Sequence, residues 1–149
     1  MSVLSWGKPK VEIGVLGALR VAPTVWIALA PLVEDSSQYT GTPGTPLTAK
    51  GEGGVLVAQK PTASEYKFVC EVYASDLTNK PIADTNGVIG SNYAVRLGPE
   101  NVTLPGFIFD ESSVSVEETW SAKTGKKWKY TFTAVEPLTG DLSKPYTKV

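Results

Sequence analysis

The sequence contains no histidine among its 149 residues. Histidine is the commonest general base, the usual activator of catalytic serine and cysteine, and the commonest metal ligand. Its absence excludes a histidine-dependent catalytic centre within one chain, and it excludes zinc sites built from histidine and cysteine. We therefore expect no catalytic residues, no metal site and no cofactor, which means that the protein is not expected to be an enzyme.

Cysteine is almost absent as well, because Cys70 is the single one and no disulfide can form within the chain. The class of small secreted domains that depend on disulfides is thereby excluded. Cys70 has no histidine with which to form a catalytic pair. We expect it to lie in the core as a small apolar side chain.

Charge of either sign is scarce, with 14 basic and 15 acidic residues and a net charge of −1. Such a balance produces no long-range field that would attract nucleic acid or an anionic membrane. The most apolar segment, residues 13–33, is interrupted by Arg20, Pro23 and Pro31, whereas a membrane span needs ~20 predominantly apolar residues. Buried strands are the better interpretation of this segment than a cleaved signal or a membrane span.

No run of ten or more residues has a convincing helical period. Instead, short runs between turn residues predict strands, and in residues 64–75 one face would carry Tyr66, Phe68, Cys70 and Val72. A single all-β domain over residues 1–149 is expected, as a sandwich or barrel of antiparallel strands. Residues 76–90 offer room for one short helix. The strands are expected at residues 11–13, 24–30, 55–59, 64–75, 92–98 and 107–109, followed by a hairpin at 113–135.

Two segments are expected to extend away from this domain. Residues 1–9 form an N-terminal arm, and residues 34–54 are rich in Gly, Pro, Ser and Thr without any helical period. Structureless loops beyond ~12–15 residues are uncommon in compact domains and are often functional or ordered by a partner. The second segment is therefore interpreted as an extended loop or a hairpin arm.

Two glycine-containing motifs resemble phosphate-binding loops but fail in detail. "GEGG" at residues 51–54 has Leu56 where a dinucleotide-binding fingerprint needs glycine, and no helix follows it. "TGKK" at residues 124–127 lacks the upstream P-loop glycine and has Lys127 in place of the magnesium-binding Ser or Thr. A flexible loop end and a hairpin turn are the better interpretations.

Two further motifs are also set aside. "DTNG" at residues 84–87 begins like a calcium loop, but Ile89 and Val95 occupy the positions that need glycine and an acidic ligand. "NVT" at residues 101–103 is a glycosylation sequon, which is common by chance and matters only in a eukaryotic secretory setting.

The stretch "SVSVEETWSAKTGKKWKYTFTAV", residues 113–135, is the most strongly patterned part of the chain. Glu117 and Glu118 point to opposite faces of a strand, so they cannot act together as a carboxylate pair. The neighbouring acids Asp110 and Glu111 are the other candidates for such a pair. The alternation predicts a hairpin with an aromatic row on one face, which includes Trp120 at its end, and a polar face of Ser, Thr, Glu and Lys.

Four stretches of the chain are informative when they are taken together and in order: "GKPKVEIG", the later "EGG", "LGPENVTLPGFIFDESSVSVEETW" and "GKKWKYTFTAVEP". They resemble the tail tube (major tail) proteins of long-tailed bacteriophages. The resemblance implies a β-sandwich or barrel subunit, related to the tube-forming proteins of bacterial secretion systems. Such subunits form hexameric rings that stack into a hollow tube, and DNA passes through the lumen without specific binding.

The same resemblance implies a virion protein that is made in the bacterial host cytoplasm. Its partners would be other copies of itself and other tail proteins (tape measure, terminator and distal tail), with no membrane involved. The family often has a flanking helix and an acidic lumen. The polar hairpin face departs from this pattern, because it combines Glu117 with Lys127 and Lys129.

Two other classes of function stay open at this point. An immunoglobulin-like or carbohydrate-binding adhesion module would use exposed aromatic side chains, with Trp6, Tyr39 and Trp120 as candidates. Another virion component, such as a tail terminator or a capsid decoration protein, would share the same sequence features.

Overall fold

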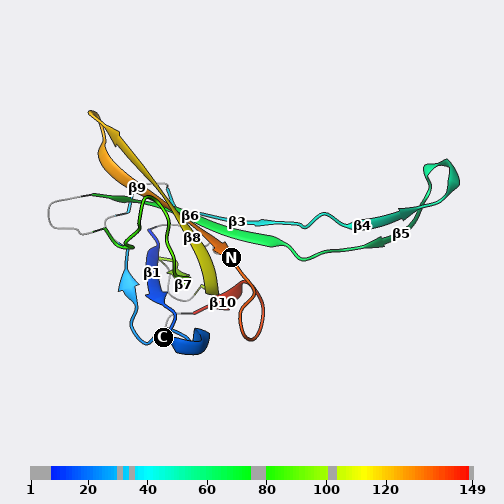
Figure 1. Ribbon diagram of the computed structural model, residues 1–149, viewed down its shortest axis with the longest axis horizontal. Helices are drawn as coiled ribbons and strands as arrows, with labels where there is room; N and C mark the ends of the chain where they lie inside the picture. Colours follow the sequence, from blue (N-terminus) through cyan, green and yellow to red (C-terminus); the bar gives the residue numbers. More distant parts are fainter. Residues whose placement is uncertain (1–7, 30–31, 34–35, 75–79, 101–103, 148–149) are drawn as a thin grey trace, which may run out of the picture.

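The computed structural model describes residues 8–29, 32–33, 36–74, 80–100 and 104–147, and its regular structure there is almost entirely β (Figure 1). This confirms the all-β class. Two short 3₁₀ turns, η1 (Ala18–Arg20) and η2 (Glu52–Gly54), are the helical elements of the described ranges. The strands are β1 (Lys10–Val15), β2 (Ile27–Ala28), β3 (Gln38–Thr42), β4 (Leu47–Lys50), β5 (Leu56–Lys60), β6 (Glu65–Tyr73), β7 (Tyr93–Gly98), β8 (Gly106–Ser121), β9 (Gly125–Ala134) and β10 (Lys144–Tyr146).

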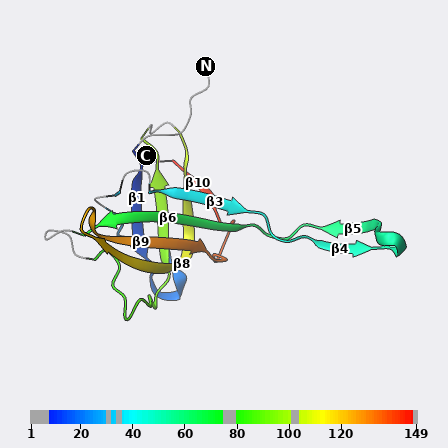
Figure 2. The same ribbon diagram turned by 90° about the horizontal axis from the view of Figure 1, so that it is seen from above.

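Eight strands form one antiparallel sheet in the order β2-β1-β7-β8-β9-β6-β3, with β10 paired to the start of β8. Residues that follow β2 bond to β1 and β6, each of which is the second strand from one end of this sheet. Leu29 N donates to Val11 O of β1, whereas Val33 N donates to Glu71 O of β6, both at 2.9 Å. The sheet therefore curls toward a barrel, and Figure 2 shows β6 and β9 crossing over β1.

In the long strand β8, the side chains that face the core change from odd-numbered to even-numbered residues part of the way along. The register slips between the pairs Tyr93–Ser112 and Val95–Phe109, so β8 has one more residue than β7 in this interval. A bulge of this kind bends the strand and re-aims its side chains. Phe107 and Phe109 consequently face the core before the bulge, and Val114 faces it afterwards.

Aromatic side chains dominate the core. Phe68, Tyr130 and Phe132 are fully buried on β6 and β9, and Phe109 joins them from β8. Burying a large apolar side chain contributes ~1.5–3 kcal/mol, so these residues supply much of the folding free energy. The predicted inward face of β6 is confirmed, because Phe68, Cys70 and Val72 are each 0% exposed.

The hairpin predicted at residues 113–135 is present as the ends of β8 and β9. Glu117 pairs in register with Lys129, and Glu118 pairs with Trp128. One part of the prediction is wrong, because Trp120 is 73% exposed rather than part of the aromatic core row. The hairpin tip extends beyond the barrel in Figure 1, and Trp120 lies near this tip because it is the second-last residue of β8.

Other expectations along the chain are only partly met. A buried strand over residues 24–30 is wrong, because β2 is two residues long and both of its residues are exposed. The described residues of the candidate helix at 76–90 form turns instead, with an isolated bridge between Thr85 and Val88. Residues 75–79, the sequon at 101–103 and most of the expected N-terminal arm, residues 1–7, lie outside the described residues.

A two-stranded arm projects far from the barrel (Figures 1 and 2). Strand β3 pairs with the start of β6, and farther out β4 pairs with β5 in a separate two-stranded sheet. At ~3.3 Å per residue, the chain from Thr42 to Lys50 covers roughly 25 Å. We call residues 43–63 the distal arm.

Candidate functional site

The phosphate-loop-like motifs occupy turns, as their sequences indicate. "GEGG" forms the distal arm's tip, where Gly53 and Gly54 both have a φ of 81°. "TGKK" starts at the last residue of the turn between β8 and β9, and Gly125, the first residue of β9, has a φ of 79°. Positive φ suits glycine because it has no Cβ. Neither backbone leads into an α-helix that would offer its N-terminus to a phosphate.

The "DTNG" motif also closes a tight turn. Asn86 and Gly87 have φ angles of 53° and 82°, which is the signature of a type I′ turn favoured by Asn-Gly. Gly87 N donates to Asp84 Oδ2 at 2.7 Å. The Asp84 carboxylate therefore holds this turn together.

The neighbouring glutamates of β8 have different surroundings. Glu117 lies opposite Lys129 on the outer sheet face. Glu118 lies on the other face, 2.5 Å from Lys80 and 3.9 Å from Lys126. The structure therefore keeps the two carboxylates apart, as the alternation predicts.

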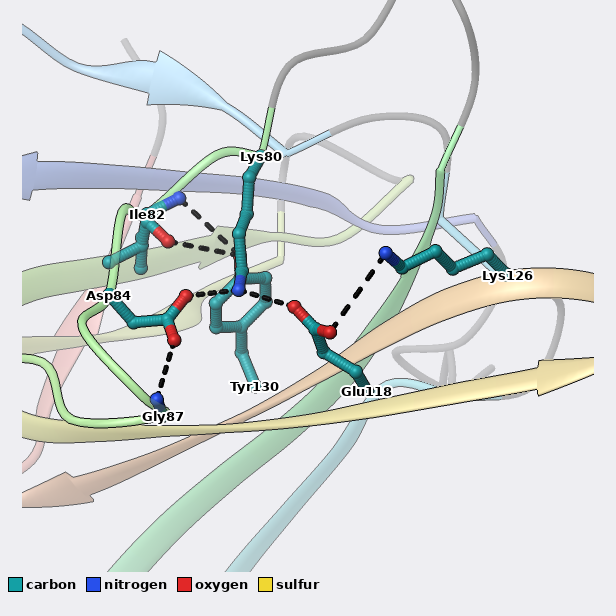
Figure 3. A network of polar contacts seen from close by, with 7 residues as sticks. All are labelled: Lys80, Ile82, Asp84, Gly87, Glu118, Lys126 and Tyr130. Carbon is teal, nitrogen blue, oxygen red and sulfur yellow. Dashed lines mark hydrogen bonds and ion pairs between the residues drawn. The ribbon is translucent and has the colours of Figure 1, made fainter.

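Lys80 links two acidic side chains beside the barrel (Figure 3). It forms ion pairs with Asp84 and with Glu118. The hydrogen bond from Lys80 holds the pKa of each carboxyl below its usual range, and these bonds raise the pKa of Lys80 itself. This network attaches the turn at residues 80–88 to β8. Each of its charges has a partner, so we assign it a structural role.

A second ion pair, between Arg20 and Glu111, connects the loop after β1 to the bulge in β8. Arg20 Nε donates to Glu111 Oε1 at 2.6 Å, and Asn92 Nδ2 donates to the other carboxylate oxygen at 2.8 Å. Burial favours a raised pKa for Glu111, but these two hydrogen bonds outweigh burial and lower its pKa. Neither network could be predicted from the sequence, because residues that form one ion pair are separated by up to 91 positions.

Cys70 lies in the core, as expected. Its side chain is completely buried, and burial raises the pKa of its thiol to about 12. A thiol of this kind stays protonated at neutral pH and is a poor nucleophile.

The distal arm is the most unusual surface of the described chain. Every residue of β4 and β5 is exposed, including the large apolar side chains Leu47, Leu56 and Val57. An isolated two-stranded hairpin is at best marginally stable in water. Exposed strand edges with apolar side chains tend to pair with another chain. The arm therefore has the properties of a segment that a partner covers.

A proline-rich joint connects the distal strands to β3 and β6. Pro43, Pro46 and Pro61 cannot donate ladder hydrogen bonds, and the register breaks at this point. The two chains come very close here, because a Cβ on Gly44 would overlap Ala63 O and Thr62 Oγ1. Thr62 Oγ1 donates to Thr45 O at 2.8 Å. The joint thus separates the pairing of β3 with β6, which belongs to the barrel sheet, from the pairing of β4 with β5 in the arm.

The outer face of β6, β9 and β8 is a broad polar surface. Glu71, Lys129 and Glu117 lie in one cross-strand row, and Tyr73, Lys127 and Thr119 lie in the next. Opposite charges across strands contribute only ~0.2–1 kcal/mol each, so they do not explain why this sheet is long. We call the side chains that share this outer face the polar sheet face. They are Lys67, Val69, Glu71, Tyr73, Ser113, Ser115, Glu117, Thr119, Lys127, Lys129, Thr131 and Thr133.

Within the described ranges, no group of three or more Cys, Asp or Glu side chains is arranged to hold a metal ion. The same ranges contain no helix with the length and apolar character needed to cross a membrane. Neither the protein-family models nor the curated proteins give a match to this chain. The arm and the polar sheet face are therefore the features on which a function can be argued.

Proposed function

We propose that this protein is a structural subunit that self-assembles into the tail tube of a long-tailed bacteriophage, as stacked hexameric rings that conduct DNA. The single observation that carries the proposal is the distal arm. Its strands β4 and β5 are exposed throughout and carry Leu47, Leu56 and Val57 on their surface. Such a hairpin gains stability when a neighbouring subunit covers it.

Self-assembly is favoured over a single foreign partner because of the resemblance of four stretches of the chain to tail tube proteins. Heterologous contacts close into rings when the rotation closes, and contacts along the axis extend the rings into filaments. The proposed place of the protein is the phage virion, after synthesis in the bacterial cytoplasm. Its further partners would be the tape measure, terminator and distal tail proteins.

The polar sheet face is our candidate for the lumen wall. Its three lysines and two glutamates leave a net charge of +1, and most of its other side chains are Ser or Thr. A wall with so little net charge neither holds DNA tightly nor repels it strongly. This suits a conduit through which DNA slides.

The test compares the wild-type chain with a variant in which Asn-Gly replaces residues 43–64. Thr42 and Glu65 pair in register, so a two-residue turn can join β3 to β6 without disturbing the barrel. Sedimentation velocity over a concentration series should show large oligomers for the wild type and smaller species for the variant. A wild-type chain that stays monomeric at every concentration would contradict the proposal.

A second candidate function, carbohydrate binding, has one observation in its favour. Trp120 is 73% exposed at the hairpin tip, and exposed aromatic rings can stack on sugars. Tyr39 suits this role less well, because its ring stacks on Phe107 at 4.4 Å and its hydroxyl hydrogen-bonds Ser143. Glycan-array binding that is lost in Trp120→Ala would support this candidate, and an array without any binding would oppose it.

A further inference from the structure

The turn at residues 84–87 contains the one Asn-Gly pair of the sequence, Asn86 followed by Gly87. Both residues are exposed. Asparagine before glycine is chemically labile, because glycine has no side chain that keeps its backbone nitrogen away from the neighbouring carboxamide. The other three asparagines precede Lys, Tyr and Val, whose side chains shield the following nitrogen. This turn is therefore the place in the sequence where a spontaneous backbone reaction is most favourable.

Deamidation is the reaction that this pair favours, because the attacking and the attacked group belong to adjacent residues. Gly87 N loses its proton to hydroxide, and its electron pair attacks Asn86 Cγ. The Cγ–Nδ2 bond breaks, and the departing nitrogen takes a proton from water, so ammonia leaves, hydroxide is regenerated and a five-membered succinimide remains. Water then adds at one of the two ring carbonyls, the C–N bond there breaks, and the nitrogen regains a proton. The products at position 86 are aspartate and isoaspartate.

The backbone of the folded turn opposes ring closure. The φ angles of Asn86 and Gly87, 53° and 82°, define a type I′ turn, which Thr85 and Val88 close with two backbone hydrogen bonds of 3.0 Å. A succinimide needs Cβ, Cα and C of Asn86 to be nearly coplanar with Gly87 N. The first central residue of a type I′ turn has a ψ of roughly +30°, at which these atoms are not coplanar. The turn must therefore open before the ring can form.

The Asp84 carboxylate adds an electrostatic restraint (Figure 3). Gly87 N, the nitrogen that would attack, donates its proton to Asp84 Oδ2 at 2.7 Å. Removal of that proton would place a second negative charge beside the carboxylate, which is unfavourable at so short a distance. Hydrogen bonds from Lys80 and from Gly87 N keep the pKa of Asp84 below its usual range. Asp84 therefore stays ionised at neutral pH and is too weak a base to remove the proton itself.

We propose that Asn86 is a deamidation site and that the Asp84 carboxylate protects it by binding the attacking nitrogen of Gly87. The inference is independent of the proposed self-assembly, because it rests on the contacts of one turn within a single chain. Asp84 is a positioning residue, since it acts on Gly87 N and takes no part in the bonds that form or break. Protection lasts while the turn is closed, so the reaction rate also reports how frequently residues 84–87 open.

Deamidation alters a turn that contributes to the core. Ile82, two residues before Asp84, is 1% exposed, and its backbone N lies 3.4 Å from the hydroxyl of Tyr130. Isoaspartate lengthens the backbone between Thr85 and Val88 by a methylene carbon, so their two hydrogen bonds cannot re-form in the same register. Both products add a carboxylate close to Asp84, and like charges repel. Each event is therefore expected to loosen this turn irreversibly.

Tandem mass spectrometry of aged protein tests the protection. The folded wild type and Asp84→Ala are incubated at mildly alkaline pH, and conversion of the Asn86 amide into an acid is followed with time. Loss of the carboxylate should speed deamidation at least about fivefold, the factor that corresponds to two unit charges ~4 Å apart in bulk water. Asp141→Ala removes an exposed acid from another loop and should react at the wild-type rate. Equal rates for Asp84→Ala and the wild type would overturn the proposal.

Asp84→Ser separates the charge of Asp84 from its hydrogen bond. A serine hydroxyl can still accept a hydrogen bond from the backbone nitrogen of Gly87, but it carries no charge. Because the protection is assigned to the charge, this variant should also deamidate faster than the wild type. A serine variant that is as slow as the wild type would contradict that assignment. A methyltransferase assay that is specific for isoaspartate should detect the product in both variants.

A denatured reference keeps the test decisive even if Asp84→Ala fails to fold. In guanidinium chloride the turn is open, so Asn86 of the wild type should react faster than it does in the folded chain. Asn86→Gln should abolish the signal, because attack on its longer side chain would have to form a less favourable six-membered ring. The other three asparagines are internal references and should stay largely unmodified. Equal native and denatured rates, or a signal that arises at another asparagine, would overturn the proposal.

Discussion

The Nε of Arg20 donates a 2.6 Å hydrogen bond to Oε1 of Glu111, which joins the loop after β1 to the bulge of β8. Arg20 is partly exposed, whereas Glu111 is only 8% exposed. A buried carboxylate needs such partners, because leaving it unpaired is costly. This one bond therefore ties the loop after β1 to the barrel.

Arg20→Ala is expected to lower the free energy of unfolding by about 1–2 kcal/mol, because Asn92 is then the one side-chain donor left to Glu111 among the described residues. The exposure of Arg20 limits the loss. Equilibrium urea denaturation measures it. Lys123→Ala, in the exposed turn between β8 and β9, is the control and should change stability little. Equal stabilities of the two variants would contradict the role given to Arg20.

Acid is expected to weaken the network around Lys80. The pKa values of Asp84 and Glu118 are lowered in the folded chain, so their stabilising contribution is present above their unfolded pKa values. It is lost as the pH falls through the folded values. The pKa of Lys80 is raised, so its contribution is present below its unfolded pKa and is lost as the pH rises through the folded value.

Lys80→Met should therefore flatten the acid limb of a plot of urea midpoint against pH. Lys67→Met is the matched control, since Lys67 lies 3.4 Å from Glu65 with both side chains about half exposed. It should leave the acid limb nearly as in the wild type. An unchanged acid limb in Lys80→Met would show that the network does not contribute to stability.

Gly106→Ala should disrupt the pairing of β7 with β8. A Cβ at Gly106 would overlap the carbonyl oxygen of Leu97, which is backbone and cannot rotate away. A loss of about 1–3 kcal/mol is expected from such overpacking, and thermal denaturation would record it. Gly98→Ala is the control because a Cβ there meets no atom within 4 Å. Similar melting temperatures for the two variants would contradict this close approach.

The thiol of Cys70 should be unreactive in the folded chain. It is fully buried, and burial raises its pKa to about 12. Ellman's reagent at pH 8 should modify it only after unfolding in urea. Rapid modification of the native protein would show that the core opens readily between β6 and its neighbours.

The strands that alternate along one register could be predicted from the sequence, as Phe68, Cys70 and Val72 show. The bulge in β8 could not, because it contains neither glycine nor proline, and the polar run of Asp110, Glu111 and Ser112 does not mark where the core-facing side chains change from odd to even positions. Trp120 was misplaced for a related reason. Alternation assigns a face of a strand, but it does not say where the facing layer ends.

The candidate surfaces were only partly visible in the sequence. The composition of residues 34–54 indicated an extended segment, and the strand predicted at residues 55–59 is confirmed as β5. The exposure of its apolar residues could not be predicted, because exposure depends on whether another layer covers the strand. The apolar run at residues 13–33 predicted buried strands, whereas Leu19, Val25 and Ile27 are exposed. Pattern alone does not distinguish an apolar residue that faces the core from one that faces a partner.

Electron microscopy of the purified wild-type chain at high concentration tests the central claim most directly. The account predicts hollow tubes of stacked rings, and it predicts that the variant with Asn-Gly in place of residues 43–64 forms no tubes. Fields that contain only dispersed monomers of the wild type, or tubes that are equally abundant in the variant, would contradict it.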